Sequence, residues 1–142
     1  MTLEGCIEKL MKIDSLQIAT VDENARPHLR VISARYFEGT DFYFLTARGK
    51  AFARQMEKNP NIAVIGFDEA ANDMVRVTGA VERVPDAEQV EKRSKVYEVY
   101  PYLENVYPGE TKEIDVIYRL TRYAVEYFTL KTHPICRGLI RQ

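Results

Sequence analysis

The sequence predicts a mainly β, α+β fold: six antiparallel strands curled into a small barrel, with flanking helices over its openings. Two observations predict it. Segments with the residue pattern of strands outnumber helical segments by six to three. Most of the strand segments follow one another across short turns, and only one helical crossover, in the middle of the chain, interrupts them. Short turns join antiparallel neighbours, whereas parallel strands need long crossover connections.

Length and composition indicate one soluble domain over residues 1–142, large enough to bury roughly two thirds of its unfolded surface. The net charge of −1 supplies no basic field that would attract nucleic acid or an anionic membrane. The longest apolar runs, such as residues 62–67, are far too short to cross a bilayer. Cys6 and Cys136 lie near opposite ends of the chain, and no signal-peptide core precedes them. We therefore expect a cytoplasmic protein without disulfides.

The first elements are a helix and a strand. Thr2 is a candidate helix cap, and apolar residues at i, i+4, i+7 and i+8 follow it up to Met11. Residues 15–22 have the composition of a strand and end in a polar turn. Pro27 then starts a new extended segment.

A β-hairpin is predicted next. Residues 29–37 and 42–46 are both rich in β-branched and aromatic side chains. The four residues between them have turn chemistry, with Gly39 free to adopt a positive φ.

Basic residues lie at both ends of this hairpin. Arg30 is early in its first strand, and Arg48 and Lys50 follow its second strand. Because a hairpin brings its two ends together, we expect these side chains to converge on one anion.

Residues 50–58 predict a helix that ends at Asn59-Pro60. Residues 62–68 and 74–84 predict two more strands. Gly79 lies in the middle of the second, where a glycine often marks a bend or a close approach of another backbone.

The last third of the chain begins with a helix. Asp86 and Gln89 have the spacing of a capping box and predict a helix up to about residue 97. Residues 97–109 are rich in tyrosine and proline and indicate irregular structure. Residues 115–130 predict either one bent strand or two short ones, and the tail after them has no clear pattern.

Several of these segments resemble one known family. They are S-L-x-I-A-T-V-D-x-x-x-x-P-H-x-R-V at 15–31, F-Y-F-L-T-A-R-G-K at 42–50, and V-R-V-T-G-A-V at 75–81, with a helix ending in N-P-N-I-A-V before the last. In order and spacing they resemble the pyridoxamine 5′-phosphate oxidase-like, FMN-binding split-barrel family over roughly residues 1–130. The short chain is most similar to the general-stress and nitroimidazole-resistance-type members.

The resemblance implies a six-stranded split barrel that forms a homodimer and holds FMN between the protomers. It implies an oxidoreductase in which Arg30 and Lys50 bind the flavin phosphate and the backbone after Arg30 faces the flavin ring. No catalytic side chain is implied. The cofactor-binding residues that we expect are Arg30, Val31, Ile32, Ser33, Leu45, Thr46, Arg48, Gly49 and Lys50.

One departure from the family limits the substrate. Family members that oxidise pyridoxamine phosphate carry a C-terminal segment rich in tryptophan and arginine. This chain has no tryptophan, and its tail offers only Arg137 and Arg141. We therefore expect an unassigned small-molecule substrate rather than a B6 vitamer.

The same residues are also compatible with other ligands. The barrel could hold a flavin without turnover, the deazaflavin F420, or haem with His28 or His133 as axial ligand. A small barrel could instead bind single-stranded nucleic acid, although the slightly acidic composition argues against a cationic groove.

The individual side chains also have simpler explanations. Arg30, Arg35 and Arg48 could be solvated surface cations. Tyrosines between residues 97 and 107 are expected to serve packing or dimer contacts, although one could cover the flavin. His133 and Cys136 have no second pair of ligands near them in the sequence, so we expect no metal site.

Overall fold

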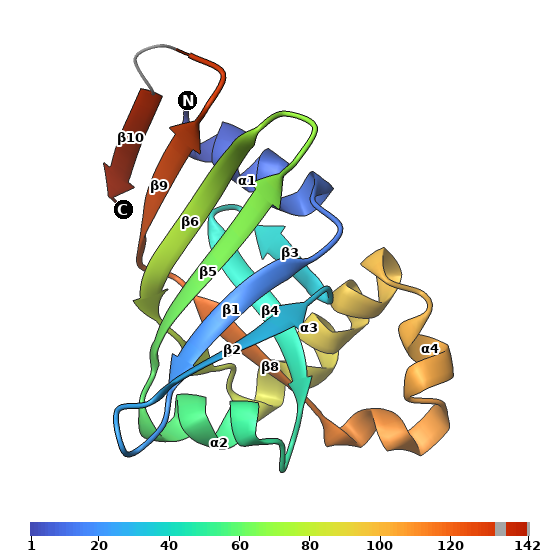
Figure 1. Cartoon of the computed structure of the whole chain (residues 1–142). Helices are drawn as coiled ribbons and strands as arrows, with labels where there is room; N and C mark the ends of the chain where they lie inside the picture. The colour runs from blue at the N-terminus through green and yellow to red at the C-terminus, as the bar shows by residue number, and fades with distance from the viewer. Residues whose placement is uncertain (133–135, 142) are drawn as a thin grey trace.

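The computed structural model describes residues 1–132 and 136–141, which form ten strands and several helices (Figure 1). The helices are α1 (Leu3–Lys12), α2 (Ala51–Lys58), α3 (Asp86–Val99), α4 (Leu103–Val106) and the 3₁₀ turn η1 (Gly109–Ile114). The strands are β1 (Leu16–Val21), β2 (Pro27–Ile32), β3 (Arg35–Glu38), β4 (Asp41–Ala47), β5 (Asn61–Asp68), β6 (Asp73–Ala80), β7 (Glu82–Arg83), β8 (Asp115–Leu120), β9 (Tyr123–Thr129) and β10 (Cys136–Arg141).

The strands form two antiparallel sheets. The larger sheet has six strands in the order β10-β9-β6-β5-β1-β2, and the smaller has four in the order β3-β4-β8-β7. The mainly β, α+β class is therefore confirmed. The count of six strands was wrong, and within the described residues the pairing does not close either sheet into a ring.

The predicted strands were too few because three of them each divide between the two sheets, and because β10 forms in the tail, where no strand was predicted. The segment 29–37 becomes β2 in the larger sheet and β3 in the smaller, and 74–84 divides in the same way into β6 and β7. The segment 115–130 becomes β8 and β9, which is the two-strand alternative left open by the sequence. Alternation of side chains shows which face a residue occupies but carries no information about its partner strand.

This division corrects the predicted hairpin. Only β3 and β4 form it, from Arg35 opposite Phe44 to Glu38 opposite Asp41. Arg30 lies outside the hairpin on β2, where it is opposite Ile18 of β1.

Of the two predicted helix caps, the structure confirms one and contradicts the other. The Thr2 cap is confirmed, because its Oγ1 accepts a hydrogen bond from the Gly5 backbone N–H at 3.1 Å. The capping box at Asp86 and Gln89 was wrong, because α3 begins without a side-chain cap. Gln89 is buried and its amide instead bonds the backbone of Val84 and Ile117, which fixes α3 against β8.

The irregular structure predicted after residue 97 is also corrected. Helix α3 continues to Val99, and α4 and η1 follow it before β8 begins. Figure 1 shows that α3 and α4 lie to one side of the two sheets.

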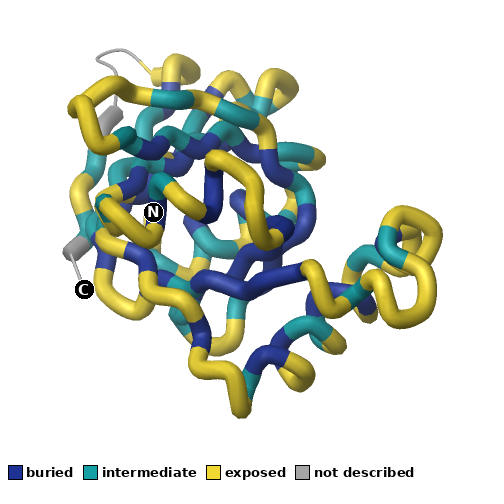
Figure 2. Tube along the Cα trace, turned by 90° about the horizontal axis from the view of Figure 1, so that it is seen from below, coloured by how far each residue is buried: buried dark blue, intermediate teal, exposed yellow. Residues whose placement is uncertain are grey.

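The smaller sheet is buried on both faces. Phe42 and Phe44 of β4 belong to the core shared with the larger sheet and α1. Tyr43 and Leu45 on the opposite face of the same strand pack against α3 and α4. Figure 2 shows buried stretches of the chain in dark blue inside the molecule and exposed segments in yellow around them. Burial on both faces explains why β4 is apolar almost throughout.

Arg35 is a buried anchor and not a solvated cation. Its side chain is 0% exposed. Its guanidinium donates hydrogen bonds to the backbone carbonyls of Leu10, Ile13, Asp14 and Ser33. The first three carbonyls lie at the C-terminal end of α1 and just beyond it. The last carbonyls of a helix have no backbone N–H partner within the helix, so another donor must satisfy them. The surface alternative for Arg35 was therefore wrong.

Gly79 is required by a close contact between backbones, as its position in mid-strand predicted. A Cβ atom on Gly79 would lie 2.8 Å from the carbonyl oxygen of Arg122. We expect Gly79→Ala to lower the free energy of unfolding by about 1–3 kcal/mol in urea denaturation, because the two backbones must separate. Gly138→Ala is the control, since a Cβ there meets nothing within 4 Å. Equal stabilities of the two variants would contradict the contact.

Candidate functional site

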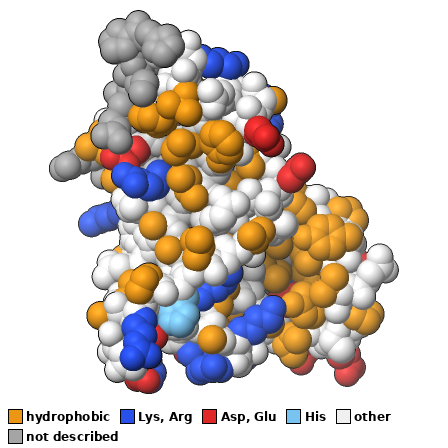
Figure 3. All heavy atoms as spheres, in the orientation of Figure 1, with side chains coloured by type: hydrophobic (Ala, Val, Ile, Leu, Met, Phe, Trp, Pro, Cys, Tyr) orange, Lys and Arg blue, Asp and Glu red, His pale blue; other side chains and the backbone are white. Residues whose placement is uncertain are grey.

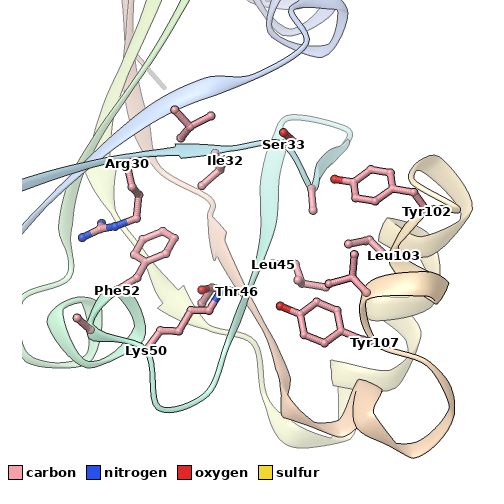
Figure 4. Close-up of a pocket in the computed structure, with 14 residues that line it drawn as sticks. Arg30, Ile32, Ser33, Leu45, Thr46, Lys50, Phe52, Tyr102, Leu103 and Tyr107 are labelled. Atoms are coloured by element: carbon pink, nitrogen blue, oxygen red, sulfur yellow. The ribbon is translucent and has the colours of Figure 1, made fainter.

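A pocket of about 530 Å³ lies where the edge strand β2, the end of β4, the start of α2 and the α4 region meet. Figure 4 shows its two ends: Arg30, Phe52 and Lys50 lie at one, and Tyr102, Leu103 and Tyr107 at the other. The predicted site residues that line it are Arg30, Val31, Ile32, Ser33, Leu45, Thr46 and Lys50.

Two of the nine predicted residues lie elsewhere. Arg48 and Gly49 form the exposed turn between β4 and α2 and are not among the lining residues. Gly49 has a φ of 81°, a conformation that favours glycine. The role of all nine residues in holding a cofactor stays a prediction.

The structure brings Arg30 and Lys50 to one pocket, but not as the two ends of a hairpin. Arg30 enters from β2 of the larger sheet, and Lys50 is the residue directly before α2, which follows a strand of the smaller sheet. The site is therefore built at the junction of the two sheets.

A network of side chains fixes the Arg30 guanidinium. Nη1 donates to Thr20 Oγ1 and Nη2 to Gln55 Oε1, both at 2.9 Å. The Thr20 hydroxyl donates to the same Gln55 oxygen at 2.6 Å, and the guanidinium carbon lies 4.3 Å from the centre of the Phe52 ring. Burial lowers the pKa of Arg30, although an arginine remains charged in proteins.

The site predicted from the sequence does not include Thr20, Gln55 or Phe52. They lie on β1 and α2, and only the packing of α2 beneath the larger sheet brings them to Arg30. No local signal marks them, because a threonine in a strand and a glutamine in a helix are ordinary.

The charge at this end of the pocket is positive. Among the described residues that line the pocket, Arg30 and Lys50 are charged and none is acidic. Helix α2 begins beside them without a side-chain cap and with no acidic residue in its first turn. Its first N–H groups and its dipole add to the attraction for an anion. This end is therefore suited to a phosphate or carboxylate.

The opposite end is apolar with two phenol groups. Leu45 of β4 faces Leu103, Tyr102 and Tyr107 of the α4 region across the pocket (Figure 4). Burial and the negative charge of Asp115 raise the pKa of Tyr107. Such a surface suits a planar, weakly polar ring system.

A buried acid, Asp115, lies near enough to Tyr107 to affect its pKa. Asp115 is fully buried, and burial raises its pKa. Its Oδ2 accepts a hydrogen bond from the Tyr97 hydroxyl at 2.5 Å, and its backbone oxygen accepts one from Arg93 at 3.1 Å. Tyr97 thus has the packing role expected of the tyrosines.

The backbone along one side of the pocket is open. β2 is the last strand of the larger sheet and pairs only with β1 in the described part of the chain. A free strand edge presents N–H and C=O groups that can pair with the edge of a planar ligand.

The two histidines offer little to this pocket. His28 pairs with Asp22, 2.9 Å from its carboxylate, and does not line the pocket. His133 lies outside the described residues, as do the side chains of Cys136, Arg137 and Arg141.

Two other kinds of feature are absent from residues 1–132 and 136–141. No group of three or more potential metal ligands lies together there. No helix there is long and apolar enough to span a membrane.

Fold and pocket together define a small α+β protein that can hold an anionic, ring-bearing ligand where its two sheets meet. The family model for pyridoxamine 5′-phosphate oxidase matches residues 6–127, which is most of the chain. The chain therefore belongs to the pyridoxamine 5′-phosphate oxidase family.

A curated relative and three solved structures are similar to this chain. The pyridoxine/pyridoxamine 5′-phosphate oxidase of Escherichia fergusonii is 31% identical over 87 residues, which cover 61% of this chain and 40% of the relative. A NimC/NimA family protein of Clostridium acetobutylicum has a TM-score of 0.82 at 20% identity, covering 99% of this chain and 92% of its own. The chain thus spans less than half the length of the oxidase that it matches.

Two further structures share the fold and differ in ligand. A pyridoxamine 5′-phosphate oxidase-related, FMN-binding protein of Nostoc punctiforme has a TM-score of 0.77 at 19% identity, covering 99% of this chain and 87% of its own. A haem-binding protein of Mycobacterium smegmatis has a TM-score of 0.78 at 12% identity, covering 98% of this chain and 57% of its own. At these identities the likeness concerns the fold alone.

Proposed function

We propose that the pocket binds FMN and that the protein is an FMN-dependent oxidoreductase of a small molecule. The observation that carries the proposal is the polarity of the pocket. Two cations lie at one end, where no acidic residue lines the pocket, and tyrosine and leucine side chains lie at the other. FMN has the matching form, with a phosphate at one end and an aromatic ring system at the other.

In this proposal each part of the pocket has one task. Arg30 and Lys50 hold the phosphate together with the first N–H groups of α2. The open edge of β2 bonds the uracil-like edge of the flavin, while Leu45 and Tyr107 pack near the ring and exclude water. The bound flavin would supply the redox chemistry, and the protein supplies binding, orientation and electrostatics.

The absorption spectrum of the purified protein tests the proposal. We expect two flavin bands in the visible region, or their appearance after addition of FMN, with quenching of flavin fluorescence. Loss of the visible bands on anaerobic addition of NADPH or NADH would then support an enzyme over an inert flavin carrier. A protein that neither contains FMN nor quenches its fluorescence would refute the proposal.

Gln55 provides a finer test, because it orients Arg30 without lining the pocket. We expect Gln55→Leu to weaken FMN binding about three- to tenfold, since the freed guanidinium must be ordered again when the phosphate binds. Fluorescence titration measures the affinity. Glu98→Leu on α3 is the control and should bind FMN as the wild type does, since Glu98 is exposed and does not line the pocket. Equal affinities of the two variants would show that Gln55 does not position Arg30.

We also propose that the protein is a homodimer with the flavin near the interface, and that the two sheets make up the split barrel of its family. Leu29 and Val31 on β2 are 71% and 61% exposed, next to the pocket. Figure 3 shows apolar side chains over the same face of the larger sheet, which no helix covers. Analytical ultracentrifugation tests the dimer, and Leu29→Asp with Val31→Asp should shift it to monomer. A wild-type monomer at micromolar concentration would refute it.

Haem remains the second candidate, because a protein with the same fold is a haem-binding protein. Within the described residues no histidine lines the pocket, and Tyr102 and Tyr107 are the side chains there that could supply an oxygen ligand. A Soret band in the purified protein would favour haem, whereas a shifted visible band would indicate F420 in place of FMN.

A further inference from the structure

The apolar end of the pocket contains a hydroxyl group that has no partner in the described part of the chain. Tyr107 directly follows α4, and its ring lies beside Leu45 of β4 with the hydroxyl turned toward the pocket (Figure 4). Four other tyrosine hydroxyls donate hydrogen bonds within the protein, those of Tyr97, Tyr118, Tyr123 and Tyr127. The hydroxyl of Tyr107 forms none with the residues that the structure describes, so it is available to a ligand.

Tyr107 is better placed for this task than Tyr102, the other tyrosine that lines the pocket. Tyr102 is 48% exposed, so water can bond its hydroxyl, whereas Tyr107 is half-buried. Burial and, after it, the negative charge of Asp115 raise the pKa of Tyr107. The phenol therefore keeps its proton at neutral pH and acts as a donor. A ligand that meets it must supply an acceptor oxygen or nitrogen.

This end of the pocket does not suit a charged group. Among the described lining residues, Arg30 and Lys50 carry the charge, and both lie at the opposite end (Figure 4). The leucines at the apolar end are buried, and an ionised group placed among them without a partner would lose its hydration. The negative charge of Asp115, which is close enough to act on Tyr107, also opposes a carboxylate or phosphate. A neutral acceptor meets neither cost.

The segment that carries Tyr107 is already held in position. The backbone N–H of Tyr107 donates to the carbonyl of Leu103 at 2.8 Å, and Leu103 is buried. Glu104 of α4 forms an ion pair with Lys112 of η1, which ties these two short segments together. A donor that is fixed before the ligand arrives loses little freedom on binding.

We infer that the hydroxyl of Tyr107 binds the carbonyl oxygen of the substrate, and that this substrate is a flat, uncharged aromatic carbonyl compound. The inference rests on the proposed function, because the substrate would lie beside FMN. A flat ring packs on leucine and tyrosine surfaces, and one neutral carbonyl satisfies the phenol. The carbonyl groups of the flavin itself are assigned to the open edge of β2, which leaves Tyr107 to the second ligand.

Three probes of similar shape test the inference by equilibrium dialysis against the FMN-loaded protein without NADPH or NADH, so that nothing is turned over. They are acetonaphthone, which has a neutral carbonyl, naphthalene, which has none, and naphthoate, which is charged. We expect the wild type to bind acetonaphthone most tightly and naphthoate about tenfold more weakly or not at all. Tyr107→Phe should weaken acetonaphthone about three- to tenfold, since one neutral hydrogen bond is lost, and leave naphthalene unchanged.

Tyr127→Phe is the matched control. It also removes one tyrosine hydroxyl, but Tyr127 bonds Asp73 at 3.1 Å and does not line the pocket. This variant should bind all three probes as the wild type does. Both variants should bind FMN within about twofold of the wild type, which shows that their pockets are intact.

Several results of these titrations would overturn the inference. They are equal binding of acetonaphthone by the wild type and Tyr107→Phe, binding of naphthoate as tight as that of acetonaphthone, and binding of naphthalene as tight as that of acetonaphthone. A loss of FMN affinity in Tyr107→Phe as large as its loss for acetonaphthone would also do so, because the hydroxyl would then serve the flavin.

Failure of the proposed function gives a different result. A wild type that binds no FMN would refute that function, and the same three probes would then be applied to the FMN-free protein. An effect of Tyr107→Phe confined to acetonaphthone would still support the carbonyl site, and its absence would overturn it.

Discussion

Replacement of Arg30 or Lys50 by alanine should weaken FMN binding about ten- to a hundredfold. Each variant loses one charge-assisted contact with the phosphate, worth about 1.5–3 kcal/mol in a partly buried site. Arg30 is held by Thr20 and Gln55 and is ready for the ligand, whereas Lys50 is exposed at the start of α2. We therefore expect the larger loss for Arg30→Ala, measured by flavin-fluorescence titration.

Riboflavin is the sharpest control for this prediction, because it has the same ring system and no phosphate. Both variants should bind riboflavin as the wild type does, and Arg122→Ala should bind FMN normally. If the affinity for FMN were unchanged in both variants, the phosphate site would be elsewhere. If riboflavin and FMN lost affinity equally, the substitutions would have disturbed the pocket rather than a phosphate contact.

Replacement of Arg35 by methionine should have the largest effect on stability, a loss of about 3–5 kcal/mol. Methionine keeps the length of the buried stem but removes the donors to four backbone carbonyls, three of them at the end of α1 and just beyond it. A buried acceptor without its hydrogen-bond partner lowers the stability by about 1–3 kcal/mol, and Arg35→Met removes the partner of more than one carbonyl. Urea denaturation followed by circular dichroism measures the change.

The control for Arg35 is Arg122→Met, which should stay within about 0.5 kcal/mol of the wild type. Arg35→Lys tests the same contacts without removing the charge, and one ammonium cannot reach all four carbonyls. A loss below about 1 kcal/mol for Arg35→Met would show that water replaces the guanidinium easily. The Ser33 carbonyl that Arg35 holds belongs to a residue lining the pocket, so FMN binding should weaken too.

Much of the local structure could be predicted from the sequence. The Thr2 cap, the strands β1, β4 and β5, and the helix that Asn59-Pro60 ends all follow from signals within a few residues. Gly79 was marked by its position in mid-strand, and the contact with Arg122 explains it. These signals are reliable because they depend on neighbours in the chain.

The residues predicted to bind a cofactor lie mostly around one pocket, and their role there stays a prediction. Seven of the nine predicted residues line the pocket, because motifs on β2 and β4 fix the segments that border it. Gln55 and Phe52, which hold Arg30, were missed. The wall made by Tyr102 and Tyr107 was foreseen only as the possibility that one tyrosine of residues 97–107 covers the flavin. Those contacts join parts of the chain that the sequence leaves far apart.

The sequence by itself determined the family, the α+β class and the two cations that the pocket shares. Only the tertiary structure decided that three long strands cross between sheets, that Arg35 is buried, and that Arg30 and Lys50 line one pocket at the junction of the two sheets. The physical reason is that sequence signals are local, whereas strand pairing depends on contacts between distant parts of the chain. Side-chain periodicity and turn chemistry report what is buried and where the chain bends, whereas the choice of partner strand depends on packing energy summed over the whole core.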